Sequence, residues 1–365
     1  MTPSKDTRPV LITGGAGFIG SNIADALAEA GHDVLVYDSL ARPGVERNLA
    51  WLEQRHGSRI ASVVADVRDE DELARAAREA KAVFHMAAQV AVTTSLADPR
   101  EDFEINLRGT LNLLDALRLR GEPVPLVFAS TNKVYGDLAD LDIGLAGDRY
   151  VPQDPQVRDR GIGEARPLDF HTPYGCSKGA ADQYVLDYAR SYDLPAAVIR
   201  MSCIYGRRQM GTEDQGWVAH FLIRALEGRP ITVYGDGCQV RDILDVSNAV
   251  EAYLAVWRNI ERLRGRAFNL GGGPENAVSL RQLIGRIAEI TGRQVEVSLE
   301  DWREGDQRYF VADTSALRSA VNVAAPVPWR DGVAALAAWL REERGLADPA
   351  PAAEAQLLAG AGASA

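Results

Sequence analysis

The feature that most constrains the fold is a glycine-rich turn near the N-terminus. Residues 13–20 read TGGAGFIG, directly after the apolar run Val10–Thr13 and before the amphipathic segment Ser21–Ala30. Glycines at this spacing permit a tight turn, let the backbone approach a pyrophosphate and let the helix pack closely on the strand. The turn therefore predicts the first βαβ unit of an α/β fold, a Rossmann-type doubly wound parallel sheet.

Alternating strands and helices continue to about residue 200. Further strands are expected at Val34–Tyr37, Ile60–Ala65, Ala82–His85, Leu126–Ala129 and Ala196–Ile199. Helices that could cross over between them are expected at Glu70–Ala80, Phe103–Arg118 and Pro173–Tyr192. The segment 136–171 is rich in Asp, Gly and Pro, which predicts a long surface loop between a strand and a helix.

Beyond Met201 the alternation is less regular, which indicates a smaller α/β substrate domain. Its elements are expected at Trp217–Glu227, Ser247–Trp257 and Ser279–Gly292 as helices and at Thr232–Tyr234 and Phe268–Leu270 as strands. We expect residues 1–200 plus about 240–266 to form the dinucleotide-binding domain, and 201–239 plus about 267–340 the smaller one. Residues 344–365 are dominated by Ala, Pro and Gly, so a flexible tail is expected there.

Composition excludes several classes of function. The formal net charge of −11 disfavours binding to nucleic acid and to anionic membranes. No apolar run is long enough to span a membrane and no signal peptide is recognisable, so a cytoplasmic location is expected. Three scattered cysteines predict no disulfide framework, and histidines without helical i, i+4 spacing predict no metal site.

An acidic residue at the end of the second strand indicates the cofactor. Asp38 stands where a carboxylate would bond the adenosine ribose and repel the extra phosphate of NADP, which favours NAD. The pyrophosphate would lie on the turn and the first helical residues, namely Gly14, Gly17, Phe18 and Ile19. Asp66 and Val67 are placed to meet the adenine, although a strand-terminal turn aspartate explains Asp66 almost as well.

A tyrosine and a lysine are spaced one helical turn apart. Tyr174 and Lys178 would share a helix face, where the ammonium, together with an oxidised nicotinamide, stabilises a phenolate. Such a tyrosine could act as the general base during the removal of a hydride. The same pair occurs by chance on many helices, and its position after the long loop is what favours catalysis.

Together these motifs resemble the extended short-chain dehydrogenases/reductases, over nearly the whole chain to about Leu340. The residues that carry the likeness are the glycine turn, Asp38, His85-Met86-Ala87-Ala88-Gln89, Asn106, Ser130-Thr131 and the Tyr174/Lys178 pair. The resemblance implies bound NAD, with Ala87, Ala88, Gln89 and Ser130 around it and Asn106 supporting the site. It also implies that Thr131 hydrogen-bonds the reacting sugar oxygen and that Lys178 holds the nicotinamide ribose.

The residues after Thr131 help to choose among the reactions of these enzymes. Nucleotide-sugar 4,6-dehydratases carry an Asp-Glu pair where this chain has Asn132-Lys133, and an amide and an ammonium cannot supply the acid and base for loss of water. Sequence drift at two loop positions is the alternative explanation. It too would leave dehydratase chemistry without its acid.

Four segments look more particularly like the CDP-tyvelose (CDP-paratose) 2-epimerases: 89–95, 131–133, 169–178 and 211–217. Cys203, where 4-epimerases and dehydratases usually carry asparagine, agrees with them, whereas Arg207 departs from the proline that is more common there. By this resemblance the substrate is a nucleoside-diphosphate sugar, inverted at C2 through a transient 2-keto intermediate. Its contacts would be Val90, Asn132, Lys133, Cys203, Gly216, Trp217, Val218, Tyr234, Gln239, Arg241, Arg303 and Asp306.

Several alternatives stay open at this stage. Arg241 and Arg303 would clamp the diphosphate, although an Arg–Asp surface pair is the commoner role of such residues. A 4-epimerase or a UDP-uronate-processing enzyme of the same family is the first rival, and a non-catalytic NAD-sensing protein is the second. By resemblance, the helices at Phe103–Arg118 and Pro173–Tyr192 would form the contact of a homodimer or higher oligomer.

Overall fold

A seven-stranded parallel sheet forms the centre of the molecule. The computed structural model describes residues 6–346. Of the tail expected at 344–365, the part from 347 onward lies outside the described residues. The strand order is β12-β8-β5-β4-β1-β2-β3. In that order the strands are Arg266–Leu270, Ala196–Met201, Leu126–Thr131, Ala82–His85, Val10–Thr13, Val34–Asp38 and Ile60–Val64.

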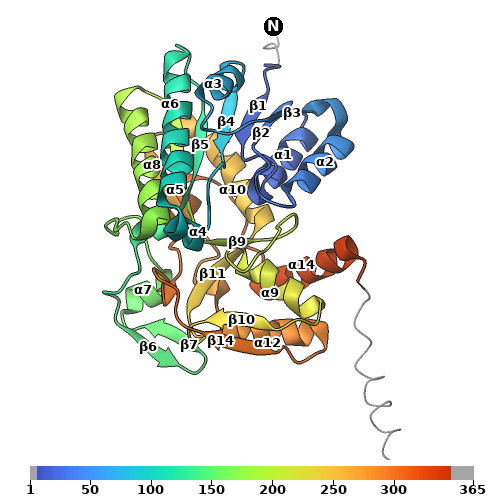
Figure 1. Ribbon diagram of the computed structural model, residues 1–365. Coiled ribbons are helices and arrows are strands. Elements are labelled where there is room, and N and C mark those ends of the chain that lie inside the picture. Colours follow the sequence, from blue (N-terminus) through green and yellow to red (C-terminus); the bar gives the residue numbers. More distant parts are fainter. Residues whose placement is uncertain (1–5, 347–365) are drawn as a thin grey trace, which may run out of the picture.

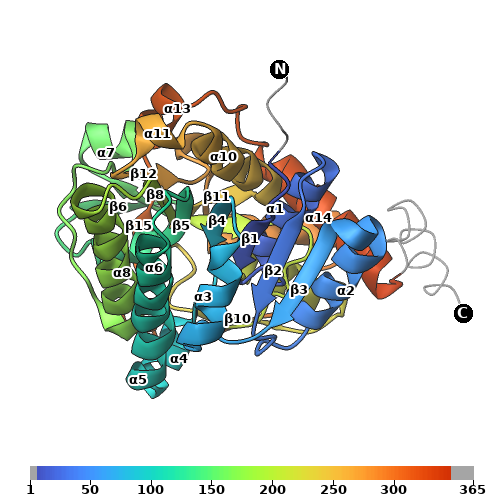
Figure 2. The same cartoon turned by 90° about the horizontal axis from the view of Figure 1, so that it is seen from above.

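Helices cover both faces of this sheet (Figures 1 and 2). Alternate residues of β1 enter different cores: Val10 and Ile12 face one helical layer, and Leu11 faces the other. The first layer contains α1 (Phe18–Glu29), α2 (Val45–His56) and α10 (Val246–Arg258). The second contains α3 (Glu70–Arg78), α6 (Gly109–Leu119) and α8 (Thr172–Ser191). The predicted doubly wound α/β class is confirmed.

The helix expected at Phe103–Arg118 is longer than the sequence suggested. It comprises α5 (Pro99–Phe103), a π-helical segment at Glu104–Arg108 and α6, and it follows a short helix α4 (Val92–Ala97). Asp98 caps α5 by accepting a hydrogen bond from the Glu101 amide. The π-helical segment shifts the following residues round the helix, and it contains Asn106.

The smaller part of the molecule lies below the C-terminal ends of the large sheet's strands (Figure 1). One of its sheets contains β9 (Cys203–Tyr205), β11 (Val240–Asp245), β13 (Ala277–Ser279) and β15 (Tyr309–Phe310); the other pairs β10 (Ile231–Tyr234) with β14 (Val297–Glu300). A separate core joins the first of these sheets to α9 (Trp217–Leu226), α12 (Leu280–Thr291) and α14 (Trp329–Arg344). The remaining short helices are α7 (Pro155–Arg160), α11 (Ile260–Leu263) and α13 (Ser315–Ala320).

Two strands are placed differently from the expected division into domains. β12, expected in the smaller domain, pairs with β8 and completes the large sheet. β11, expected in the dinucleotide-binding domain, pairs with β9, β13 and β15. The segment 136–171, expected to be a loop, contains a hairpin of β6 (Ile143–Ala146) and β7 (Arg149–Pro152) as well as α7. Gly147 in the hairpin turn has φ +65°, a conformation that glycine adopts readily.

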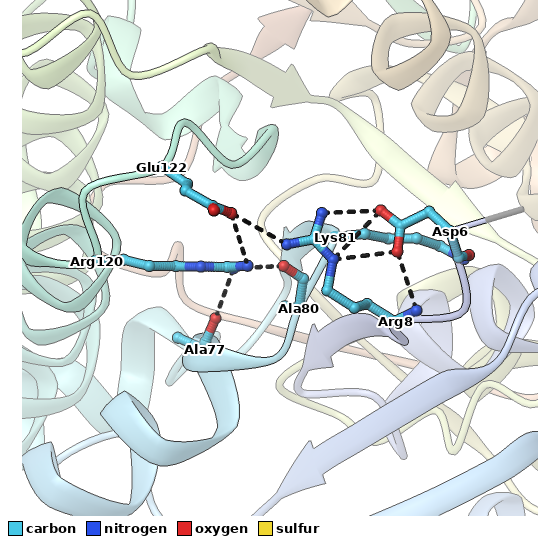
Figure 3. Close-up of polar contacts among 7 residues, drawn as sticks. All are labelled: Asp6, Arg8, Ala77, Ala80, Lys81, Arg120 and Glu122. Atoms are coloured by element: carbon cyan, nitrogen blue, oxygen red, sulfur yellow. Dashed lines mark hydrogen bonds and ion pairs between the residues drawn. The ribbon is translucent and has the colours of Figure 1, made fainter. Parts of the chain in front are cut away.

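A polar cluster ties the start of β1 to the N-terminal edge of the sheet (Figure 3). Arg8 pairs with Asp6 at 2.9 Å and with Glu122 at 3.3 Å. The Arg120 guanidinium, beyond the end of α6, donates to the Ala77 and Ala80 carbonyls at the end of α3. The cluster lies at the N-terminal ends of the strands, whereas the predicted site lies at their C-terminal ends. Within residues 6–346, no helix is both long and apolar enough to cross a membrane.

Candidate active site

The glycine turn is built to receive a phosphate group. Gly14 has φ +68°, and a Cβ there would lie 2.6 Å from the Ala87 amide nitrogen; a Cβ on Gly20 would lie 2.2 Å from the Gly14 carbonyl oxygen. Helix α1 begins after Gly17 without a side-chain cap. Among residues 6–346 no side chain caps this first turn, so the N–H groups of Phe18 and Ile19 are available to a pyrophosphate.

Asp38 lies at the end of β2 beside this turn. Its carboxylate accepts from the Ala16 amide at 3.0 Å and from the Leu40 amide at 2.9 Å. Burial raises its pKa, while these backbone hydrogen bonds act in the opposite direction. An acceptor fixed next to the glycine turn fits the ribose of NAD, and the geometry of the turn fits its pyrophosphate.

The residues expected near the adenine have other contacts as well. Asp66 is ion-paired with Arg68 at 2.6 Å, and this pairing lowers the pKa of the aspartate. Val67 is buried in the core between β3 and α6, where its side chain touches Gly109. Its carbonyl accepts from the Asn112 side chain at 3.2 Å.

Asn106 fixes the loop that follows β4. Its Oδ1 accepts from the Gln89 amide at 2.8 Å, and its Nδ2 donates to the Gln89 carbonyl at 3.0 Å. Asp102, buried on the same helix, accepts from Asn106 and Gln89 at 3.1 Å each and from the Ser177 hydroxyl. These bonds position Ala87, Ala88 and Val90, which lie partly buried in the loop. Sequence reasoning missed Asp102, whose only local signal is its spacing of one turn before Asn106.

Thr131, Tyr174 and Lys178 are brought together at the C-terminal end of β5. Thr131 ends that strand, and Tyr174 hydrogen-bonds its side chain from the first turn of α8. Burial raises the pKa of Tyr174 to about 12, and the hydrogen bond with Thr131 partly offsets this rise. In the protein alone the phenol is therefore protonated at neutral pH, so the site needs positive charge to form a phenolate.

Lys178 supplies one such charge from an unusually dry position. It is 3% exposed, and its Nζ lies 4.2 Å from the centre of the Phe128 ring. Burial lowers the pKa of Lys178 to about 7, although the carboxylates of Asp182 and Asp102 raise it. While it is protonated, this ammonium lies one helical turn from Tyr174 on α8, where its charge stabilises a phenolate.

A buried ion pair joins α8, the helix that carries Tyr174 and Lys178, to β8. Asp182, one turn after Lys178 and 0% exposed, accepts two hydrogen bonds of 2.9 Å from the Arg200 guanidinium. Ser130, expected next to the cofactor, donates to the same carboxylate at 2.8 Å. Asp182 is a second residue that the sequence analysis missed, although its i+4 spacing from Lys178 is visible.

The residues expected to contact the substrate meet where β5 faces the loop 303–307. The Asn132 amide donates to Gln307 at 2.9 Å, and Lys133 Nζ donates to the Gly305 carbonyl at 3.0 Å. Asp306 accepts from Arg241 at 2.6 Å and lies 3.9 Å from Lys133. Two basic groups thus surround one carboxylate, and burial lowers the pKa of Lys133, so an added anion such as a diphosphate would favour its charged form. Gln307 was not anticipated, because only the fold brings it to Asn132.

A second group of expected contacts surrounds β9 and β10. The Trp217 indole donates to Cys203 Sγ at 3.4 Å, and burial raises the pKa of that thiol. Arg303 stacks over Tyr234 at 3.7 Å and pairs with Asp214 at 3.3 Å. The Gln239 side chain donates to the Tyr234 carbonyl at 2.7 Å.

Two further residues of this group differ in their surroundings. Gly216 has φ +76° and directly precedes α9. Val218, by contrast, is 2% exposed and packs in the core of the smaller part, so its side chain is not open to a ligand as expected.

Comparison with known proteins identifies the family. The sequence model of the NAD dependent epimerase/dehydratase family matches residues 10–271, which include the glycine turn, Tyr174 and Lys178. The chain belongs to this family. It is accordingly an NAD-dependent enzyme, and the cofactor inferred from Asp38 is confirmed.

Several members of the family resemble the chain along nearly its whole length. A CDP-paratose 2-epimerase of Salmonella typhi is 41% identical over 337 residues, which are 90% of this chain and 98% of the relative. A dTDP-glucose 4,6-dehydratase of Streptomyces griseus is 31% identical and covers 94% of this chain and 97% of its own. The crystal structure of a Thermus thermophilus UDP-glucose 4-epimerase in complex with NAD superimposes with a TM-score of 0.76 at 32% identity, covering 91% of this chain and 99% of that one.

Proposed function

We propose that this enzyme inverts C2 of a CDP-hexose of the paratose/tyvelose type. The observation that carries the proposal is a complete Thr131–Tyr174–Lys178 set next to Asn132 and Lys133, neither of which is a carboxylate. Transient oxidation is thus supported, whereas elimination of water lacks its acid and base. The 41% identity to a CDP-paratose 2-epimerase supports the nucleotide and the carbon.

The residues have distinct tasks in this reaction. Tyr174, as phenolate, takes the proton of the C2 hydroxyl, while Thr131 holds the same oxygen by a hydrogen bond. NAD, held by the glycine turn and Asp38, would supply the acceptor and donor of the C2 hydride. After the 2-keto sugar turns over in the pocket, Tyr174 gives its proton back to the C2 oxygen. The charge of Lys178, one helical turn away, lowers the free energy of the phenolate form of Tyr174.

The substrate is held by groups that already face one another. Arg241 and Lys133 lie on either side of Asp306, and a diphosphate would replace or join this carboxylate. Because NAD is regenerated within each turnover, the enzyme should need no added cofactor. The glycine turn and Asp38 provide its binding site.

Proton NMR of the purified protein with CDP-paratose, UDP-glucose and UDP-glucuronate in separate tubes, without added cofactor, tests the proposal. Inversion at C2 of the CDP-sugar alone is expected. Conversion of a UDP-sugar at another carbon would instead support the 4-epimerase or uronate-processing alternative, for which relatives about 30% identical include a putative UDP-glucose 4-epimerase of Methanocaldococcus jannaschii. Stoichiometric consumption of NAD would contradict the mechanism.

We also propose that the enzyme is a cytoplasmic homodimer. Helices α6 and α8 lie side by side on one flank (Figures 1 and 2), and large apolar side chains are exposed on α5, on α8 and just after α8: Phe103 48%, Tyr184 44% and Tyr192 52%. Exposed aromatic side chains on neighbouring helices support a subunit contact on this flank. Sedimentation analysis of Tyr184→Arg tests the dimer, with a shift to monomer expected.

The cysteines support the proposed cytoplasmic location. Within the described residues all three are free thiols, in keeping with a reducing compartment.

A further inference from the structure

Two asparagines connect the glycine turn to the chain that leaves the substrate site. Asn48, on α2, donates from Nδ2 to the Ala16 carbonyl and to the Arg208 carbonyl, both at 3.1 Å. Asn22, on α1, donates from Nδ2 to the Phe18 carbonyl at 2.8 Å and to the Arg207 carbonyl at 3.1 Å. Each amide thus bridges one carbonyl of the NAD-binding segment and one of residues 207–208.

Asn48 is an unusual residue to bury for packing alone. Its side chain is 0% exposed, and its Oδ1 has no hydrogen-bond partner among residues 6–346. A buried acceptor without a partner lowers the stability of the folded state. The two hydrogen bonds that Nδ2 donates are the favourable contribution of this amide. Those two bonds therefore define what Asn48 contributes.

Arg208 is held firmly from several sides. It is a non-glycine residue with φ +70°, a strained conformation that persists only where its surroundings determine it. Its guanidinium lies 3.9 Å from the ring of Trp51 on α2 and 5.5 Å from that of Trp339 on α14. The α2 helix thus fixes both the backbone and the side chain of this residue.

The chain continues from Arg208 directly into the predicted substrate wall. Gln209 donates to the Ile204 carbonyl at 3.2 Å, and its side chain touches the backbone of Gly216 so closely that a Cβ there would lie 2.8 Å from Nε2. Gly216 precedes Trp217, whose indole bonds Cys203. An unbroken series of contacts therefore runs from Ala16 in the glycine turn to Cys203.

We propose that Asn22 and Asn48 are positioning residues that couple NAD retention to occupation of the nucleotide-sugar site. A nucleotide bound against the segment 209–217 would hold residues 207–208, and through the two amides the glycine turn, in the NAD-binding conformation. By linkage, bound NAD would favour nucleotide binding to the same extent. The identity of the nucleotide rests on the proposed function, but the coupling does not.

Exchange of bound NAD for radiolabelled NAD in the purified holoenzyme measures this coupling. The exchange rate is recorded without nucleotide, with CDP and with UDP, for the wild type, Asn48→Ala and Asn22→Ala. In the wild type the recognised nucleotide should slow exchange by at least about 5-fold, the lower end of usual coupling between sites. In each variant the slowing should fall below about 2-fold, while the nucleotide still binds.

Asn112→Ala is the matched control. This amide donates to the Val67 carbonyl near the expected adenine position, and no bond of its side chain to residues 207–208 is found within the described part of the chain. Its loss should speed exchange with and without nucleotide alike, leaving their ratio unchanged. Melting curves of all variants verify folding, and Asn22→Ala, at a partly exposed site, carries the test if Asn48→Ala does not fold.

The outcomes separate the two proposals. Slowing by UDP and not by CDP would overturn the assignment of the nucleotide and leave the coupling intact. No slowing by either nucleotide in the wild type, or equal slowing in the wild type and both asparagine variants, would overturn the coupling.

Discussion

Replacing Lys178 by methionine should make the enzyme more stable and inactive. Methionine has a similar length and no charge, so it can occupy the dry position over Phe128. Lys178 has a pKa of about 7 in the folded protein against 10.5 for an ordinary lysine. Burial thus penalises the ammonium in the folded state, and the unfolded chain binds the proton more tightly.

The size of the effect follows from these two pKa values. At pH 7 the penalty is about 4 kcal/mol, and it is fully present below that pH. Between pH 7 and 10.5 the folded protein releases the proton before the unfolded chain does, so the penalty falls to about 2 kcal/mol at pH 9. The gain in stability for Lys178→Met is therefore about 4 kcal/mol at pH 7 and about 2 kcal/mol at pH 9.

Chemical unfolding of the wild type and Lys178→Met at the two pH values measures this difference. Lys81→Met, at the opposite edge of the sheet, is the control and should change stability by less than about 0.5 kcal/mol. Turnover of Lys178→Met should fall by at least about 100-fold, because the phenolate loses its nearby cation. A variant that is less stable than the wild type at both pH values, or a gain that does not change with pH, would refute the reasoning.

Three other changes have defined outcomes. Tyr174→Phe removes the proton acceptor and should lower kcat by about 10²- to 10⁴-fold, with NAD still retained on gel filtration; a smaller loss would assign the base elsewhere. Burial lowers the pKa of His85 to about 3, so protonation favours the unfolded chain as pH falls below 6.5, and the wild type should lose about 2 kcal/mol between pH 7 and 5. His85→Gln should lack this slope in urea titrations, and an unchanged slope would contradict the explanation. Arg120→Ala frees two carbonyls at the end of α3 and should cost about 1–2 kcal/mol in thermal unfolding, whereas Arg75→Ala, an exposed pair on α3, should cost less than about 0.5 kcal/mol; equal costs would argue against the role of Arg120.

The sequence was most informative where local chemistry determines local structure. The glycine turn and the six expected strands of the large sheet are found with shifts of no more than two residues at their ends, because buried parallel strands are nearly continuous apolar runs. The seventh strand, β12, was detected as Phe268–Leu270 but assigned to the smaller domain. Its place in the sheet depends on pairing with β8, which no local pattern records.

Elements that depend on distant partners were missed. β13 and β15 have three and two residues, too few for any periodicity, and only pairing with β11 defines them. Helix α2 carries many charged residues, so its sequence shows only a weak apolar pattern. Its few apolar residues are buried against the core that α1 and α10 also form.

The site shows the same contrast. Tyr174 and Lys178 share one helical turn, so their spacing alone placed them together. The partners of Asn132 and Lys133, by contrast, lie 175 and 172 residues further along the chain, in the loop 305–307. Asp182 was overlooked because a carboxylate on a helix is usually exposed, whereas here Arg200 permits its complete burial.

Transfer of deuterium tests the central claim, reversible oxidation at C2, most directly. CDP-paratose carrying deuterium at C2 would be incubated with the enzyme in ordinary water, without added NAD. The deuterium content at C2 of the remaining substrate and of the inverted product would then be determined by NMR and mass spectrometry. Transient oxidation predicts that the inverted product keeps deuterium at C2, because the hydride is returned within the site. Inversion with loss of deuterium to solvent would contradict the account, since it would show that C2 is deprotonated and not oxidised.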